Sequence, residues 1–249
     1  MVTAIRKGFT LVELLIVITI LVILGIFVIL LINPAEILAK SRDSQRISDL
    51  ATMKGAMQLF LTDTTTDLTT FMTDNCAATI PIPDTNLAGR NKIFASLKKQ
   101  PNSAAAAANK YSGKFGDTGD AARKLNNGTG WMPVEFTTVG SGAPLDSLPT
   151  DPSADLSADA DTSWTDLLIA RYYRFGCYSN GGKLEYEFDA GLESGTWGPA
   201  ATGLGNKGAN DGGNANSGGT TAQNVRYEAG NNLTILPATA SIEPSLATP

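Results

Sequence analysis

An apolar run near the N-terminus constrains this chain more than any other feature. Residues 9–32 read FTLVELLIVITILVILGIFVILLI and carry a single charge, at Glu13. As a helix the run is about 36 Å long, which is enough to cross a hydrocarbon core of about 30 Å. It is longer than the apolar core of a secretory signal peptide, and no convincing small-residue cleavage site follows it. The run therefore predicts a transmembrane helix.

The charges beside the run predict its orientation. Arg6 and Lys7 precede it, and Glu36 is the first acidic residue beyond it. Because basic residues stay on the cytoplasmic side, residues 1–8 are expected in the cytoplasm and the chain after Asn33 is expected to be exported. The sequence predicts a single-pass protein of the inner or cytoplasmic membrane. On hydropathy alone, a plain N-terminal anchor would explain the apolar run equally well.

Two details favour more than an anchor. Glu13 places a carboxylate inside the span, where an acidic residue costs about 2.5–3.5 kcal/mol at the helix centre and needs a partner. Gly8 leaves the backbone unobstructed at the cytoplasmic interface, where a protease can reach it. A simple anchor requires neither feature.

The segment RKGFTLVELLIV, which begins at Arg6, resembles the class III leader of type IV pilins and type II secretion pseudopilins. The resemblance implies that a prepilin peptidase cuts between Gly8 and Phe9 and N-methylates the new Phe9 amine. It also implies that Glu13 pairs with the N-terminal amine of a neighbouring subunit. The implied partners are other subunits of a homo- or heteropolymeric filament, the peptidase, an inner-membrane assembly platform, and membrane lipid before assembly. The filament would lie at the cell surface or in the periplasm.

Composition narrows the chemistry available to the rest of the chain. Histidine is absent, and only two cysteines are present, which removes the Ser/His and Cys/His nucleophile arrangements and the commonest transition-metal ligand. With 19 basic and 24 acidic residues, the chain has no evident direct site for nucleic acid. These observations predict a structural protein and not an enzyme.

The helix is expected to continue beyond the span as an amphipathic segment over residues 33–61. Its buried stripe is predicted to be apolar, and consists of Ile47, Leu50, Met57, Phe60 and Leu61. Asn33 can cap this segment, and Pro34 lacks the N–H that would bond the preceding turn. A hinge is predicted between Gly25 and Pro34.

Residues 62–236 are expected to form the exported head, and residues 237–249 a flexible tail. Alternating residues around Ser179-Asn180-Gly181-Gly182 predict an antiparallel hairpin with one wet face, from residues 169–178 to residues 184–189. Further strands are predicted at residues 133–139, 225–228 and 233–236, and a short helix at residues 87–99. The fold class is therefore α+β, a long N-terminal helix packed on a small antiparallel sheet as in pilins.

Several candidate sites are weak on sequence grounds. Asp151, Asp155, Asp159 and Asp161 supply oxygen ligands for calcium, and pseudopilins bind calcium in a C-terminal loop, but the ligand spacing matches no calcium motif. The Gly203-Leu204-Gly205-Asn206-Lys207-Gly208 pattern lacks the strand and helix of a dinucleotide site. Two N-glycosylation sequons, at Asn127 and Asn232, are assigned no role. No other cofactor is expected.

Cys76 and Cys177 can either pair or stay free thiols, and pairing is slightly favoured for an exported domain. A bond would close a loop of about 100 residues, which the chain-entropy model values at about 4.7 kcal/mol.

Three functions stay open from the sequence: a subunit of a type IV pilus-like filament, a pseudopilin of a type II secretion system, and a membrane-anchored exported enzyme or binding domain. The third lacks any identifiable active constellation.

Overall fold

The computed structural model describes residues 9–77, 93–96, 111–112, 120–153, 172–198 and 226–236. The chain divides into two compact units, residues 1–39 and residues 40–249. The predicted leader, the flexible tail and the Gly-rich stretch at residues 203–219 lie outside the described residues.

The long N-terminal helix is broken at Asn33. Helix α1 spans Leu11–Ile32 and α2 spans Pro34–Asp63. Asn33 adopts a left-handed conformation with φ 43° and ψ 78°, and its carbonyl and side-chain oxygens accept from the Glu36 N–H. This break lies within the interval from Gly25 to Pro34, and α1 continues through Gly25 to Ile32. Glycine keeps its N–H and can stay in the helical ladder, whereas Pro34 cannot donate to the preceding turn.

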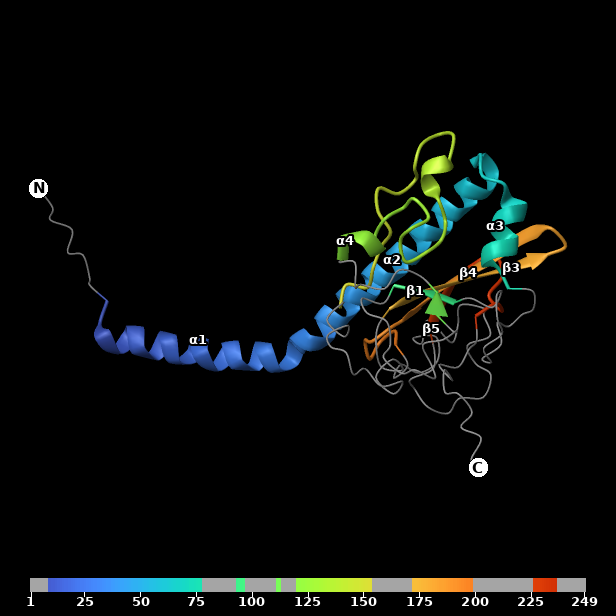
Figure 1. Ribbon diagram of the computed structural model, residues 1–249. Helices are drawn as coiled ribbons and strands as arrows, with labels where there is room; N and C mark the ends of the chain where they lie inside the picture. Colours follow the sequence, from blue (N-terminus) through green and yellow to red (C-terminus); the bar gives the residue numbers. More distant parts are fainter. Residues whose placement is uncertain are drawn as a thin grey trace, which may run out of the picture. The chain divides into compact units, whose positions relative to one another are not determined.

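The head contains a five-stranded sheet of order β2-β1-β3-β4-β5 (Figure 1). The strands are β1 (Ile93–Ala95), β2 (Tyr111–Ser112), β3 (Tyr173–Asn180), β4 (Lys183–Gly191) and β5 (Arg226–Gly230). All neighbours pair antiparallel except β1 with β2. The β3–β4 hairpin turns at Gly181 and Gly182, with φ 58° and 90°, the positive values that a two-residue turn requires. The α+β fold class and the hairpin are therefore confirmed.

One face of the sheet packs against α2. The core joins α2 to the sheet through apolar and aromatic side chains, among them Leu50, Met53, Met57, Phe60, Phe175, Tyr186 and Phe188. Two hydroxyls reinforce this contact: the Tyr173 hydroxyl donates to Asp49 at 2.8 Å, and the Tyr186 hydroxyl donates to the Lys54 carbonyl at 3.3 Å. The predicted packing of the helix on the sheet is confirmed, although Ile47 and Leu61 are only half-buried.

Short helices and turns complete the described head. Helix α3 spans Leu68–Asn75, α4 spans Asp120–Arg123 and the 3-10 helix η2 spans Phe136–Thr138. The strand predicted at residues 133–139 is therefore wrong. The Thr138 hydroxyl bonds the Glu135 carbonyl at 2.7 Å, a local contact that competes with a strand ladder.

The helix predicted at residues 87–99 is also wrong where it is described. Residues 93–95 form β1, and Phe94 pairs with Phe175, their ring centroids lying 6.0 Å apart. Pairing across the sheet overrides the helical spacing of the local sequence.

The second face of the sheet is wet only near the turn, where Glu185 is half-buried, and this corrects the prediction for the hairpin. Glu187 and Asp189 alternate with the core residues of β4, yet both are fully buried. Residues 233–236 do not form the predicted strand, because the N–H groups of Ile235 and Leu236 donate to the Glu187 carboxylate at 2.7 and 2.8 Å instead of to a neighbouring strand.

Candidate functional site

The N-terminal end of α1 presents an exposed aromatic residue and a capped first turn. Phe9, the first described residue, is 79% exposed. Thr10 is the N-cap, in an extended conformation, and its hydroxyl accepts from the Glu13 N–H at 3.2 Å. Gly8, the predicted cleavage position, lies just outside the described residues. The backbone is therefore extended, and not helical, directly after the predicted cut.

Glu13 completes a capping box at this end. One of its carboxylate oxygens, Oε2, accepts from the Thr10 N–H at 2.9 Å and from the Thr10 hydroxyl at 2.8 Å. The other oxygen, Oε1, has no partner within the part of the chain that the structure describes. Thr10 thus orients Glu13 and leaves half of its carboxylate available to a group from another molecule.

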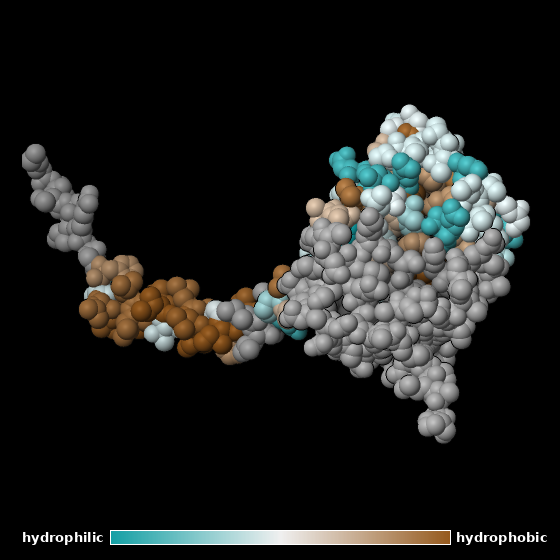
Figure 2. All heavy atoms as spheres, viewed as in Figure 1, coloured by the Kyte–Doolittle hydropathy of each residue, from teal (hydrophilic) through white to brown (hydrophobic). Residues whose placement is uncertain are grey.

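The rest of α1 offers an apolar surface with no polar face. Its described side chains are exposed from Leu11 to Val28, and by length and composition this helix could cross a membrane. Figure 2 shows the helix as a nearly continuous hydrophobic surface. The Thr19 hydroxyl is satisfied within the helix by the Leu15 carbonyl at 2.8 Å. A helix that is apolar on every side requires lipid or protein around it.

In the head, the N-terminal part of α2 is held by a buried charge cluster centred on Arg46. Its guanidinium donates to both oxygens of Asp151, at 2.7 and 2.9 Å, to Asp43 at 2.7 Å and to Glu193 at 2.7 Å. Arg46 and Asp43 are fully buried. Arg42 adds two bonds to Glu193 at 2.6 and 3.1 Å. The cluster ties α2 to two loops that are distant in sequence.

Electrostatics keep this cluster charged. Burial opposes the charged form of Asp151, but the hydrogen bonds and charge of Arg46 outweigh it and hold the pKa of Asp151 below its ordinary value. The pKa of Glu193 is lowered in the same way. Burial acts to raise it, but the hydrogen bonds and charges of Arg42 and Arg46 outweigh that effect. Burial also disfavours the charged form of Arg46, yet its three carboxylate partners raise its pKa overall.

Of the four predicted calcium ligands, only Asp151 lies within the described residues, and it is engaged in an ion pair. Both Asp151 oxygens accept from Arg46, and Asp151 Oδ1 also accepts from Ser153, so this residue is corrected from metal ligand to ion-pair partner. Asp155, Asp159 and Asp161 lie outside the described residues. Within the described ranges, no group of three or more histidine, cysteine or acidic side chains is arranged to hold a metal ion.

A second buried charge cluster covers the face of the sheet away from α2. Asp189 on β4 accepts from Arg174 on β3 at 2.8 and 2.9 Å and from Arg226 on β5 at 2.7 Å. A further Arg174 nitrogen bonds Asp189, and Arg226 also lies over the Tyr172 ring. Despite complete burial, these two cations hold the pKa of Asp189 below its ordinary value.

Glu187 lies beside this cluster, and among the described residues it forms no ion pair of its own. Its Oε2 accepts the two backbone bonds from residues 235 and 236, while its buried Oε1 has no hydrogen-bond partner in the described structure. Burial is the main cause that raises the pKa of Glu187 to about 8, and the charge of Asp189 adds to it.

Stability should therefore fall as the pH rises from about 4.5 to about 8. A raised carboxyl pKa means that the folded chain holds a proton that the unfolded chain has already released, so the stabilising effect of that proton is complete below pH 4.5 and is lost as the pH approaches 8. The Glu187→Gln variant, which stays neutral, should show a flatter dependence of melting temperature on pH over this interval. Equal slopes for both proteins would contradict the assignment.

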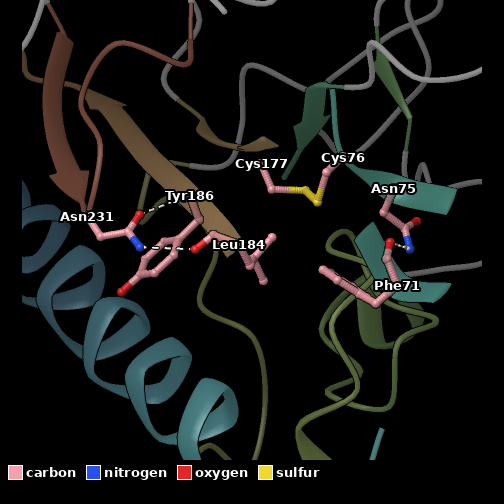
Figure 3. Close-up of a disulfide and its surroundings, with 7 residues drawn as sticks. All are labelled: Phe71, Asn75, Cys76, Cys177, Leu184, Tyr186 and Asn231. Carbon is pink, nitrogen blue, oxygen red and sulfur yellow. Dashed lines mark hydrogen bonds between the residues drawn. A yellow bond between two sulfur atoms is a disulfide. The ribbon is translucent and has the colours of Figure 1, made fainter. Parts of the chain in front are cut away.

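Cys76 and Cys177 form a disulfide, with Cα atoms 4.7 Å apart and a sequence separation of 101 (Figure 3). Both are buried. The bond joins the end of α3 to β3, beside a parallel bridge between Ala77 and Tyr178. Asn231 fastens the neighbouring strand β4, accepting from the Tyr186 N–H at 2.7 Å and donating to the Leu184 carbonyl at 3.2 Å.

Removing the disulfide should destabilise the head by about 2–5 kcal/mol, because a long loop would regain freedom in the unfolded chain. The test is the unfolding midpoint of a Cys76→Ala, Cys177→Ala double variant with and without reductant. The wild type should lose stability when reduced, whereas the variant should not respond. A reductant effect of the same size in the variant would show that the disulfide is not its cause.

The sequence reasoning did not identify the Arg46 cluster, although a signal was present. Most of the buried positions of α2 are spaced by three and four residues, among them Asp43, Arg46, Leu50, Met53, Met57 and Phe60. Extending the apolar stripe backwards leads to Asp43 and Arg46, an acidic and a basic residue three apart. Their partners, Asp151 and Glu193, are more than 100 residues away and carry no local signal.

Comparison with known proteins agrees with the N-terminal features. Residues 4–29 match the family model described as the prokaryotic N-terminal methylation motif. No curated protein and no solved structure matches the chain. The matched residues include Gly8 and Phe9, and also Thr10 and Glu13, which form the capping box at the start of α1. The chain therefore carries the N-terminal leader signature of type IV pilins and pseudopilins.

Proposed function

We propose that the chain is a structural subunit of a type IV pilus-like filament, cut between Gly8 and Phe9, N-methylated at Phe9 and polymerised through α1. The methylation motif over residues 4–29 is the observation that carries this proposal. It supports a pilin- or pseudopilin-type exported protein with a structural role. A prepilin peptidase and an inner-membrane assembly platform are the partners that such a leader requires.

The assembly step pairs Glu13 of one subunit with the Phe9 ammonium of a neighbour. The exposed end of α1 supports this pairing, because Thr10 occupies one Glu13 oxygen and leaves the other available. In a dry interface an unpaired carboxylate is costly, and an ammonium supplied by the next subunit removes that cost and defines the register between helices. Cleavage creates this ammonium, so processing must precede polymerisation.

The apolar surface that α1 presents beyond Glu13 supports burial against lipid before assembly and against other α1 helices afterwards. The head would then form the outside of the filament. A secretion pseudopilin would use the same leader and the same apolar helix, and it is the alternative within this class. Titrating calcium into the head tests the remaining prediction for Asp155, Asp159 and Asp161, since binding should raise its melting temperature.

The direct test is the N-terminal residue of purified filaments. We expect methylated Phe9, read by mass spectrometry of the mature subunit. A Gly8→Leu variant should accumulate as uncut precursor and form no filaments, because the side chain obstructs the backbone at the cut. A tethered enzyme or binding domain would be indifferent to this change. Filaments that begin at another residue would overturn the proposal.

A further inference from the structure

Two N-glycosylation sequons occur in the head, at Asn127-Gly128-Thr129 and Asn232-Leu233-Thr234. We propose that Asn127, and not Asn232, is the acceptor of an oligosaccharide transferred from a polyprenyl-diphosphate carrier. The inference rests on the proposed function in one respect: the acceptor must lie on the exported side of the membrane. The structure distinguishes the two sequons by exposure and by what each asparagine amide already bonds.

The Asn127 side chain is exposed and its amide nitrogen is available. The Thr129 hydroxyl donates to Asn127 Oδ1 at 2.7 Å, and the Thr129 N–H donates to the same oxygen at 3.2 Å. Both residues are exposed, and Gly128 between them has φ 76°. Within the described residues, Asn127 Nδ2 has no hydrogen-bond partner. The oxygen of the amide is thus engaged by the sequon hydroxyl while the nitrogen is free to react.

The turn that carries Asn127 is anchored on both sides. Asn127 and Glu135 form an antiparallel bridge, and the Phe136 N–H donates to the Asn126 carbonyl at 2.8 Å. The Asn126 side chain donates to the Leu145 carbonyl at 2.6 Å. Backbone bonds and Asn126 make these contacts, whereas the Asn127 side chain, within the described residues, bonds only Thr129 and does so through its oxygen, not its nitrogen. An added sugar would therefore displace no structural contact of that side chain.

Asn232 is an internal comparison. Its Oδ1 also accepts from the hydroxyl and the N–H of its sequon threonine, Thr234, at 2.7 and 3.0 Å, so the two sequons differ only in burial and in what the amide nitrogen bonds. Its side chain is half-buried, and its Nδ2 donates to Glu185 Oε2 at 2.7 Å. Hydrogen bonds from Asn232 and Asn180 hold the pKa of Glu185 below its ordinary value, so the acceptor is charged at neutral pH. The residues that follow, Ile235 and Leu236, are buried. Transfer to Asn232 would have to take place at a nitrogen already held by a charge-assisted bond, which Asn127 does not make.

The reaction is a substitution at the anomeric carbon of the carrier-linked sugar. Asn127 Nδ2 forms the new bond to that carbon, the bond from the carbon to the diphosphate oxygen breaks, and the amide nitrogen loses one of its two protons, which balances as a proton on the leaving diphosphate or in solvent. The polyprenyl diphosphate leaves with the bonding electron pair, and no oxidant or reductant is involved. The reaction requires an oligosaccharyltransferase that acts on the side of the membrane to which the head is exported.

The test uses the full chain produced in its own organism. Membranes and filaments are digested, and peptides containing Asn127 and Asn232 are read by mass spectrometry. We expect a glycan on Asn127 and none on Asn232. Asn127→Gln and Thr129→Val should abolish the modification, Thr129→Ser should keep it, and the matched changes Asn232→Gln and Thr234→Val should leave it unaltered. An unmodified Asn127, deamidation of Asn127 without added sugar, or a glycan on Asn232 would overturn the proposal.

Two further measurements separate this inference from the proposed function. Protease accessibility of the head in intact cells reports whether it is exported. A Glu13→Leu subunit, which is expected to insert but not to polymerise, should still carry the glycan. An exported head with an unmodified Asn127 defeats the glycan site alone, and a head retained in the cytoplasm defeats both.

Discussion

Replacing Glu13 by leucine should abolish filaments while leaving membrane insertion and leader cleavage intact. The variant removes the carboxylate expected to pair with the Phe9 ammonium of the next subunit. Removing one partner of a buried pair costs about 3–5 kcal/mol. At about 1.4 kcal/mol per tenfold change, each contact between subunits weakens by about two to four orders of magnitude. The loss repeats at every subunit, so polymerisation should fail completely.

Two matched variants separate charge from local structure at this position. Glu13→Gln can still complete the capping box with Thr10 but carries no charge, so it should also fail to assemble. Thr19→Leu removes a hydroxyl that bonds only its own helix and should assemble normally. Filament yield by electron microscopy, with precursor and mature forms separated on gels, measures both outcomes. Normal filaments from the Gln variant would show that the cap, and not the charge, is required.

Replacing Arg46 by methionine should lower the free energy of unfolding by about 3–5 kcal/mol, a large part of the about 5–15 kcal/mol typical of a folded domain. The change leaves Asp43 and Asp151 buried without their cation. Methionine fills part of the space, so the loss is electrostatic more than steric. Unfolding of the full-length chain in detergent, followed by tryptophan fluorescence, measures the effect, because Trp131 is fully buried in the head.

Arg42 is the control for this prediction. Its side chain is 35% exposed and pairs with Glu193 at the edge of the same cluster. Exposed ion pairs contribute about 0–1 kcal/mol, so Arg42→Met should change stability little. Similar losses in the two variants would show that burial does not determine the contribution of this cluster.

Much of the fold could be predicted from local patterns. The apolar run, the Asn33-Pro34 break and the hairpin around Gly181 each depend on residues close in sequence, where helix length, the missing proline N–H and turn chemistry decide the outcome. Strand β1 could not be predicted in this way, because the pairing of Phe94 with Phe175 overrides a helical spacing. Local periodicity does not report the partner across a sheet.

The buried charges mark the other limit of prediction. The alternation along β4 gave the correct inward residues, but Glu187 and Asp189 were expected to face water. Their burial depends on Arg174 and Arg226, which come from two other strands. The N-terminal site was more predictable, since Gly8, Phe9 and Glu13 lie within six consecutive residues. The roles of Thr10 and Arg46 required the three-dimensional contacts.

The bond between Cys76 and Cys177 determines what happens when a protease cuts the chain between them. The 100 residues between the two cysteines form a covalent loop, closed at its base by buried sulfur atoms. A protease that cuts once anywhere within this loop separates the chain into two peptides that stay joined. The N-terminal peptide keeps α1, and the C-terminal peptide keeps the hairpin. A subunit nicked there would stay in one piece until a reductant reached its core.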